Sequence, residues 1–178
     1  AHVGVTVPES RVIGLAETES GCIAESEIDR LLEWASAAQA MLLGCGLQHG
    51  APLDTLLDRL LASGLDLPLI LDAAVLGSLA ERAEALKHWS GPSILLPHAG
   101  EMARLIGCER KDVAADPLSG ARRAAETYGT VTLCKGEYSH VVAPDGHAFR
   151  FRGGGVGLAT SGSGDALAGI VGGLAARG

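Results

Sequence analysis

The sequence predicts an α/β fold with a mostly parallel central sheet covered by helices on both faces. Short apolar segments alternate along the chain with amphipathic segments of helical periodicity. Strands that are apolar throughout are typical of parallel sheets buried on both faces. The 178 residues suit one domain, and only 3% of them are aromatic, so small aliphatic side chains must form most of the core.

The first half of the chain begins with alternating residues before Pro8, which predict a strand. Ser26, followed by acidic residues, predicts the N-cap of a helix. Two later apolar runs predict buried strands, and leucines at helical spacing predict a second helix that ends at Gly64. The expected elements are strands at 2–7, 40–43 and 68–72 and helices at 26–38 and 52–63.

The second half continues the alternation. Asp116 and Pro117 predict an N-cap with proline at the first helical position, and Pro144-Asp145-Gly146 predicts the turn of a β-hairpin. The glycines of the last helix predict a buried helix that packs closely. The expected elements are helices at 78–89, from His98 through Ile106, at 117–128 and at 166–177, and strands at 93–97, 130–134, 139–143 and 147–151.

Composition excludes several classes of function. The net charge is −7 and no basic cluster offsets it, which argues against a nucleic-acid-binding groove. No apolar run is long enough to cross a bilayer, so we expect no membrane association. The four cysteines lack paired spacing, so we expect free thiols, no metal site built by the protein, and a cytoplasmic location.

Polar residues and glycines follow the predicted strands at their carboxyl ends. They are Gly44-Cys45-Gly46, Asp72, His98 and Lys135, and this edge of an open α/β sheet is where ligands bind. Plainer interpretations remain for three of them: the glycines could form only a tight turn, Asp72 could be only a cap, and Lys135 could be a surface residue. Neither Cys45 nor Cys134 has an evident acid–base partner, so covalent catalysis is not expected.

The segment Gly157-Leu-Ala-Thr-Ser-Gly-Ser-Gly-Asp165 leads into the last helix. Its backbone amides and the positive end of the helix dipole would together form a site for an anion. A carboxylate would repel a bound phosphate, so Asp165 favours chemistry beside the phosphate, such as accepting the proton of an attacking hydroxyl. In the plainer interpretation Asp165 only caps the helix.

Five motifs in order resemble the ADP/ATP-dependent NAD(P)H-hydrate dehydratases of the ribokinase-like superfamily. They are Leu43-Gly-Cys-Gly-Leu47, Leu71-Asp-Ala-Ala-Val-Leu76, Leu96-Pro-His-Ala-Gly-Glu-Met-Ala-Arg-Leu105, Leu133-Cys-Lys-Gly136 and Gly157–Asp165. Each motif alone is weak to moderate, but together they cover nearly the whole chain. The resemblance implies a ribokinase-like three-layer α/β/α fold with a mostly parallel central sheet.

The resemblance also implies a reaction. ADP or ATP would phosphorylate the hydroxyl of the (6S) hydrate of NADH or NADPH, and phosphate elimination would restore the reduced dinucleotide. The enzyme would thus be a hydro-lyase that repairs nicotinamide nucleotides, with Mg²⁺ carried on the phosphates. We further expect a homo-oligomer.

The family's site residues map onto this chain by motif. Asp165 would be the catalytic base and would also contact the hydrate, together with Gly46 and His98. The nucleotide would lie along two segments of the chain, composed of Lys135, Gly136, Glu137, Tyr138 and Ser139, and of Ser161, Gly162, Ser163 and Gly164.

The sequence also departs from the family's pattern. Ala74 replaces the second aspartate of Asp-Ala-Asp, and Gly77, Ala99, Cys45 and Gln48 replace an asparagine, two prolines and a glycine. The family begins earlier and continues later, so we expect residues 1–178 to form a single domain truncated at both termini. Two alternatives stay open: a ribokinase-like kinase of a vitamin precursor, and a nucleotide-binding domain without turnover. The second is suggested by the loss of the acidic residue at position 74.

Overall fold

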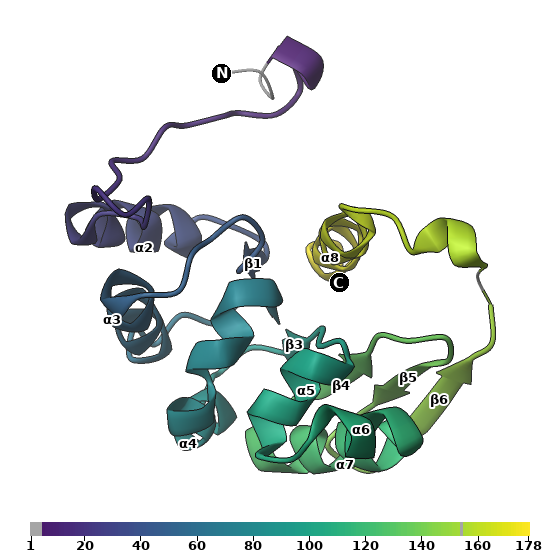
Figure 1. Ribbon diagram of the computed structural model, residues 1–178. Coiled ribbons are helices and arrows are strands. Elements are labelled where there is room, and N and C mark those ends of the chain that lie inside the picture. The colour runs from purple at the N-terminus through teal and green to yellow at the C-terminus, as the bar shows by residue number, and fades with distance from the viewer. Residues whose placement is uncertain (1–4, 154) are drawn as a thin grey trace.

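The structure is a computed structural model that describes residues 5–153 and 155–178. A six-stranded sheet forms its centre, with a layer of helices on one face and helix α8 (Ser163–Ala175) on the other (Figure 1). This three-layer α/β/α arrangement confirms the predicted fold class. The strands are β1 (Met41–Leu43), β2 (Leu69–Leu71), β3 (Ser93–Leu95), β4 (Val131–Cys134), β5 (Ser139–Val142) and β6 (Ala148–Phe151).

The strands follow one another in the sheet in the order of the sequence. Strands β1 to β4 pair in parallel, whereas β5 and β6 add the predicted antiparallel hairpin at one edge. Leu43 lies opposite Leu71, which in turn lies opposite Leu95. The first three strands therefore end at one level, and the segments that follow them meet at a common edge.

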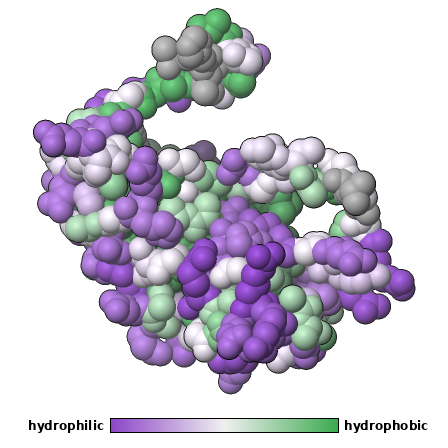
Figure 2. Space-filling view, viewed as in Figure 1, coloured by the Kyte–Doolittle hydropathy of each residue, from purple (hydrophilic) through white to green (hydrophobic). Residues whose placement is uncertain are grey.

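The thick helical layer covers one face of the sheet and contains the main hydrophobic core. Leu56, Leu57 and Leu60, three of the leucines whose spacing predicted a helix, are at most 1% exposed. The outer surface of α5 to α7 is largely hydrophilic (Figure 2). The helices of this layer are α2 (Ile28–Ser36), α3 (Ala51–Leu61), α4 (Ala83–Lys87), α5 (Ala99–Ile106), α6 (Arg110–Ala115) and α7 (Pro117–Tyr128).

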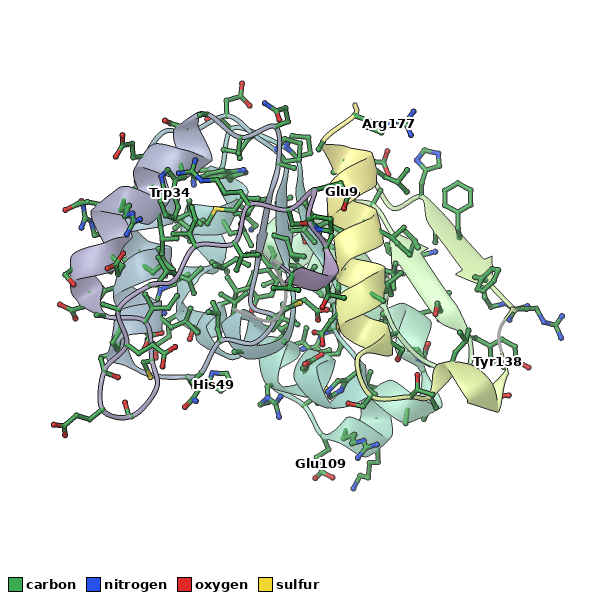
Figure 3. All side chains as sticks on the ribbon, turned by 90° about the horizontal axis from the view of Figure 1, so that it is seen from above. Glu9, Trp34, His49, Glu109, Tyr138 and Arg177 are labelled. Atoms are coloured by element: carbon green, nitrogen blue, oxygen red, sulfur yellow. The ribbon has the colours of Figure 1, made fainter. Side chains whose placement is uncertain are left out.

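Helix α8 lies across β1 and β2 on the opposite face (Figure 3). Side chains alternate along β2, so Leu69 and Leu71 enter the main core while Ile70 packs beneath α8 with Ala168. The sequence predicted a buried helix, but Ile170 is 62% exposed, and Ala168 is the one buried residue among those described for α8. The prediction of close packing fails for most of this helix.

Helix α8 also begins three residues earlier than predicted, at Ser163 instead of Ala166. Ser163, Gly164 and Asp165 therefore belong to its first turn and not to the preceding loop. Position along the helix then decides where each side chain points, because residues three or four apart share a face.

Other differences concern short segments. Residues 2–4 of the strand predicted at 2–7 lie outside the described residues, and Val5 and Thr6 are helical. The helix expected at 78–89 is divided into 3₁₀ turns and the short α4, and α6 was not predicted. Ser26 lies within a 3₁₀ turn instead of capping α2. The 3₁₀ segments are η1 (Glu25–Glu27), η2 (Ala73–Ser78), η3 (Ala80–Arg82) and η4 (Val156–Leu158).

Candidate active site at the carboxyl edge of the sheet

The turn after β1 is held tightly against the segment that follows β2. Gly44 has φ +125°, and a Cβ added to it would lie 1.7 Å from the backbone oxygen of Asp72. A side chain at position 44 is therefore incompatible with both the backbone conformation and the space. Gly44 fixes the turn from which Cys45 and Gly46 emerge.

Asp72 has two structural roles at this edge. Its Oδ1 atom accepts a hydrogen bond of 2.7 Å from the backbone N–H of Ala73, which caps η2. The same atom lies 2.7 Å from Nζ of Lys135, which follows β4. The Asp72 side chain is only 2% exposed, so the predicted cap role is correct and an ion pair is added to it.

The backbone next to Asp72 is strained. Ala73 has φ +50°, and it is the one non-glycine residue of the described chain with positive φ. Such a conformation is unfavourable for an L-residue with a Cβ atom, and it persists only where the surroundings enforce it. The strain supports a functional interpretation of this edge over that of an ordinary turn.

His98 follows β3 and begins α5. Its Nδ1 accepts hydrogen bonds from the backbone N–H groups of Gly100 and Glu101, while Oε2 of Glu101 accepts one from the backbone N–H of His98. This reciprocal capping box fixes the start of α5. His98 also forms a parallel bridge with Lys135, which brings these two predicted site residues together.

The first turn of α8 lies beside Lys135. A Cβ added to Gly164 would be 3.7 Å from Nζ of Lys135. Gly162 is the N-cap, and no side chain caps the helix, so Asp165 does not have the capping role of the plainer interpretation. The amide of Ser163 donates to the backbone oxygen of Thr160, so the amides of Gly164 and Asp165 are the ones that lie with the cation of Lys135 in an arrangement suited to a phosphate.

Cys45 occupies the space between these groups. Burial raises the pKa of its thiol to about 11, and the nearby carboxylate of Asp165 acts in the same direction. Asp72 and Asp165 add repulsion of the thiolate, whereas Lys135 opposes the shift. The thiol is therefore protonated at neutral pH and is not a nucleophile, in accord with the absence of predicted covalent chemistry.

The remaining predicted nucleotide-binding residues are spread along one side of this edge. Gly136, Glu137 and Tyr138 are exposed in the segment between β4 and β5, and Ser139 begins β5. Arg150 and Arg152 each lie with Cζ 5.7 Å from the centre of the Tyr138 ring. Tyr138 lies near the beginning of α8, far from Arg177 at its other end (Figure 3). Ser161 lies in the turn before α8.

Gly46 is on the opposite side of the edge. It lines a pocket of about 380 Å³ between the N-terminal segment and the start of α3, with Gln48 and Pro52 among the other lining residues. The structure does not bring Gly46 into contact with Lys135, so the predicted site extends over a broad area.

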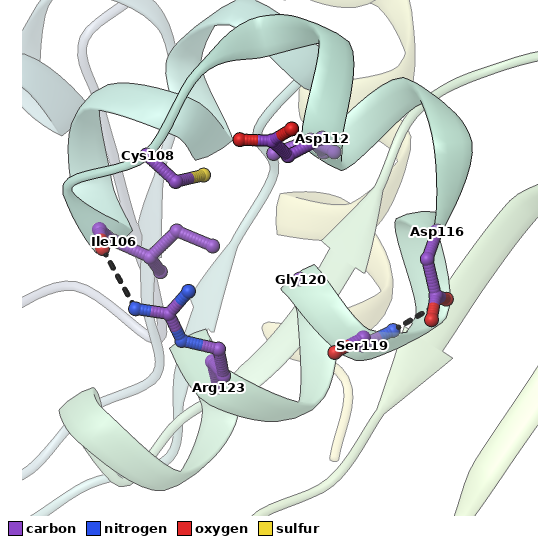
Figure 4. Close-up of a pocket in the computed structure, with 8 residues that line it drawn as sticks. Ile106, Cys108, Asp112, Asp116, Ser119, Gly120 and Arg123 are labelled. Atoms are coloured by element: carbon purple, nitrogen blue, oxygen red, sulfur yellow. Dashed lines mark hydrogen bonds between the residues drawn. The ribbon is translucent and has the colours of Figure 1, made fainter.

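A second pocket of about 150 Å³ lies among α5, α6 and α7 (Figure 4). Arg123 donates a hydrogen bond to the backbone oxygen of Ile106 at its margin. His98 is the N-cap of α5, whereas Ile106 is its last residue. This pocket therefore lies at the opposite end of the helix from the candidate site.

Two features were not predicted from the sequence. The influence of the Asp165 carboxylate on the Cys45 thiol joins distant parts of the chain, and no motif spacing indicates it. Ala74, which replaces an acid of the family pattern, is buried in the main core.

Among residues 5–153 and 155–178, no group of three or more His, Cys, Asp or Glu side chains could hold a metal ion, and no helix is long and apolar enough to cross a membrane.

Comparison with known proteins identifies the family. The sequence profile of the NAD(P)H-hydrate dehydratase family matches residues 3–177. The chain belongs to this family. An ADP-dependent (S)-NAD(P)H-hydrate dehydratase of Xanthomonas campestris is 39% identical over 177 residues, which are 99% of this chain and 58% of the relative.

Solved structures agree with this assignment of the NAD(P)H-hydrate dehydratase family. The ADP/ATP-dependent NAD(P)H-hydrate dehydratase of Bacillus subtilis, co-crystallised with ATP and Mg²⁺, is 30% identical with a TM-score of 0.66, covering 80% of this chain and 51% of that one. A ribokinase-like superfamily protein of Enterococcus faecalis has a TM-score of 0.76 at 24% identity over 99% of this chain and 57% of its own, which supports the ribokinase-like fold. The chain spans 32% to 58% of the length of three curated relatives.

Proposed function

We propose that the chain carries the site of an ADP- or ATP-dependent dehydratase that returns (6S)-NADHX or (6S)-NADPHX to NADH or NADPH. The observation that carries the proposal is the first turn of α8, in which Asp165 is an exposed carboxylate and the preceding residue, Gly164, lies beside Lys135. Phosphate-binding and proton-accepting groups thus occur together at the sheet edge where the family motifs converge. The family relationship supports this chemistry for the chain.

The reaction begins with phosphoryl transfer. The carboxylate of Asp165 accepts the proton of the hydrate hydroxyl as its oxygen attacks the terminal phosphorus of the nucleotide, and the shortened nucleotide leaves. The N–H groups at the start of α8 and the ammonium of Lys135 stabilise the charge on the phosphoryl oxygens. The ring nitrogen then expels phosphate from the carbon, and loss of a proton from the neighbouring carbon restores the dihydronicotinamide.

Mg²⁺ is compatible with these residues as an ion bound mainly by the nucleotide. Mg²⁺ commonly uses one or two carboxylates together with substrate phosphates and water. Asp165 is exposed at the site, whereas Asp72 is buried and paired with Lys135. Asp165 is therefore the carboxylate that could face the ion, which would neutralise phosphate charge when bound.

The remaining site assignments extend over the surface around this centre. Gly46 and His98 would contact the hydrate, and Gly136 to Ser139 together with Ser161 to Gly164 would contact the nucleotide. The His98 side chain is 56% exposed, although its Nε2 lies 3.4 Å from Oε1 of Glu101. The protein would act in the cytoplasm as a homo-oligomer.

The test is an assay of reduced nicotinamide. The protein is added to (6S)-NADHX with Mg²⁺ and either ADP or ATP, and the near-ultraviolet absorbance is followed. A rise that requires nucleotide supports the proposal and identifies the phosphoryl donor. A flat trace contradicts it: accumulation of a phosphorylated product would then indicate a kinase, and nucleotide binding alone would indicate a domain without turnover.

A further inference from the structure

Three exposed side chains of the β5–β6 hairpin form a cluster of planar groups. Cζ of Arg150 and Cζ of Arg152 each lie 5.7 Å from the centre of the Tyr138 ring. Ser139 pairs with Phe151 in the ladder between β5 and β6, and Tyr138 and Arg152 are the next residues outward on the two strands. Arg150 is two positions from Arg152, so the two arginines share one face of the hairpin.

This cluster lies at the carboxyl edge of the sheet. Strand β5 runs antiparallel to β4, and β6 runs antiparallel to β5, so β6 has the direction of β4. Lys135 follows β4 and Arg152 follows β6, and both residues therefore lie at the edge that carries the candidate site. Lys135 and Tyr138 are separated by at most about 10 Å of extended chain.

The guanidinium groups of Arg150 and Arg152 are not used to hold the fold together. Within the part of the chain that the structure describes, neither group takes part in an ion pair or a hydrogen bond, and the contact with the Tyr138 ring is the interaction that each makes. Both arginines are exposed, and Tyr138 is 40% exposed. The cluster therefore presents a ring, two guanidinium planes and unused N–H donors to a ligand.

The proposed places of the two substrates leave one direction for the base of the nucleotide. Its terminal phosphates would lie between Lys135 and the first turn of α8, and the hydrate would lie toward Gly46 and His98. The segment 136–139 leads from Lys135 to the hairpin. A nucleotide that follows this segment away from the hydrate brings its base to Tyr138.

We propose that Tyr138, Arg150 and Arg152 form the subsite for the base of the nucleotide. This inference rests on the proposed function, in which ADP or ATP binds at Lys135. The base stacks on the ring and on the guanidinium planes, since every base has a π-face that aromatic side chains and arginine can cover. The unused N–H groups donate to acceptor atoms of the base and the ribose.

Calorimetric titration of the whole chain with two ligands separates the base from the phosphates. In the presence of Mg²⁺, ADP probes the entire site, whereas inorganic pyrophosphate probes only its phosphate end. Tyr138→Ala, Arg150→Ala and Arg152→Ala should each weaken ADP binding roughly 5- to 100-fold, the range for loss of a base-stacking side chain. Pyrophosphate affinity should be unchanged in all three variants. Lys135→Met should weaken binding of both ligands.

Two variants serve as matched controls. Tyr138→Phe retains the aromatic ring and should bind ADP as the wild type does. Arg177→Ala removes the same charge as the arginine variants, but at the end of α8 that lies far from Tyr138 (Figure 3). It should leave the affinities for ADP and pyrophosphate unchanged, so any loss in Arg152→Ala is not a general effect of net charge.

The outcomes separate the subsite from the proposed function. Unchanged ADP affinity in Tyr138→Ala, or in both arginine variants, overturns the subsite. Equal weakening of ADP and pyrophosphate also overturns it, because the contacts would then be to phosphate. If the wild-type chain binds ADP but produces no NADH, the proposed function fails, and the titrations still decide the subsite. A wild-type chain that binds no ADP overturns both.

Discussion

Nζ of Lys135 lies 2.7 Å from Oδ1 of Asp72, although 63 positions separate the two residues in the sequence. Asp72 follows β2 and Lys135 follows β4. Because β3 lies between these strands, the ion pair crosses over the carboxyl end of β3. The Asp72 side chain is 2% exposed and that of Lys135 is 19% exposed. The pair therefore directs the ammonium group toward the first turn of α8, where the terminal phosphates are proposed to bind.

Lys135→Met should both destabilise the protein and weaken nucleotide binding. Removing one partner leaves a buried carboxylate without its counter-charge, which costs about 3 kcal/mol of unfolding free energy in comparable pairs. Urea denaturation and calorimetric titration with ADP or ATP measure the two effects. Lys135→Met combined with Asp72→Asn should recover much of the stability but not the affinity. Unchanged affinity in the single variant would remove Lys135 from the proposed nucleotide site.

Asp165→Asn should retain nucleotide affinity and lose turnover. The amide has the shape of the carboxylate but cannot accept the hydroxyl proton, and loss of a general base typically reduces the rate by about 10²- to 10⁴-fold. Calorimetric titration and the nicotinamide assay are made on the same preparation, with Asp145→Asn as the matched control. A near-normal rate would mean that another group accepts the proton.

His98 should have separable roles in stability and in substrate binding. Its ring caps α5, and asparagine is also a good N-cap, so His98→Asn should keep the thermal stability that His98→Ala loses by about 1 kcal/mol. Both variants remove the imidazole and should raise KM for the hydrate. If His98→Asn has a normal KM, the ring serves only as the helix cap.

Gly44→Ala should be far more damaging than Gly64→Ala. Both glycines have positive φ, +125° and +71°, but only Gly44 has a neighbour within 4 Å of the added Cβ. The difference isolates the collision with the Asp72 backbone from the cost of the conformation itself. Chemical denaturation should show a loss of more than about 2 kcal/mol for Gly44→Ala relative to the control. Equal losses would contradict the close approach.

Much of the fold could be predicted from local sequence. The largely apolar segments near residues 41, 69, 93 and 131 became strands, since a strand buried on both faces must be mostly apolar. Asp116 and Pro117 set the start of α7 through their own backbone chemistry, with the Asp116 carboxylate accepting from the N–H of Ser119. Such signals operate within a few residues and require no knowledge of the rest of the chain.

Other parts could not be predicted, because distant contacts decide them. The segment at 78–89 has helical character in the sequence, yet it forms 3₁₀ turns and the short helix α4. The exposure of α8 also depends on what covers it, and its composition alone suggested burial. Tertiary packing overrides local preference in both cases.

By itself, the sequence determined the order of strands and helices, the sheet edge that carries the polar residues, and the motifs that indicate the family. Only the tertiary structure decided which of those residues meet: Lys135 with Asp72, and Lys135 with His98. The reason is physical. Local periodicity fixes which side of a strand or helix a residue occupies. The register of the parallel strands and the packing of α8 on β1 and β2 fix which side chains meet.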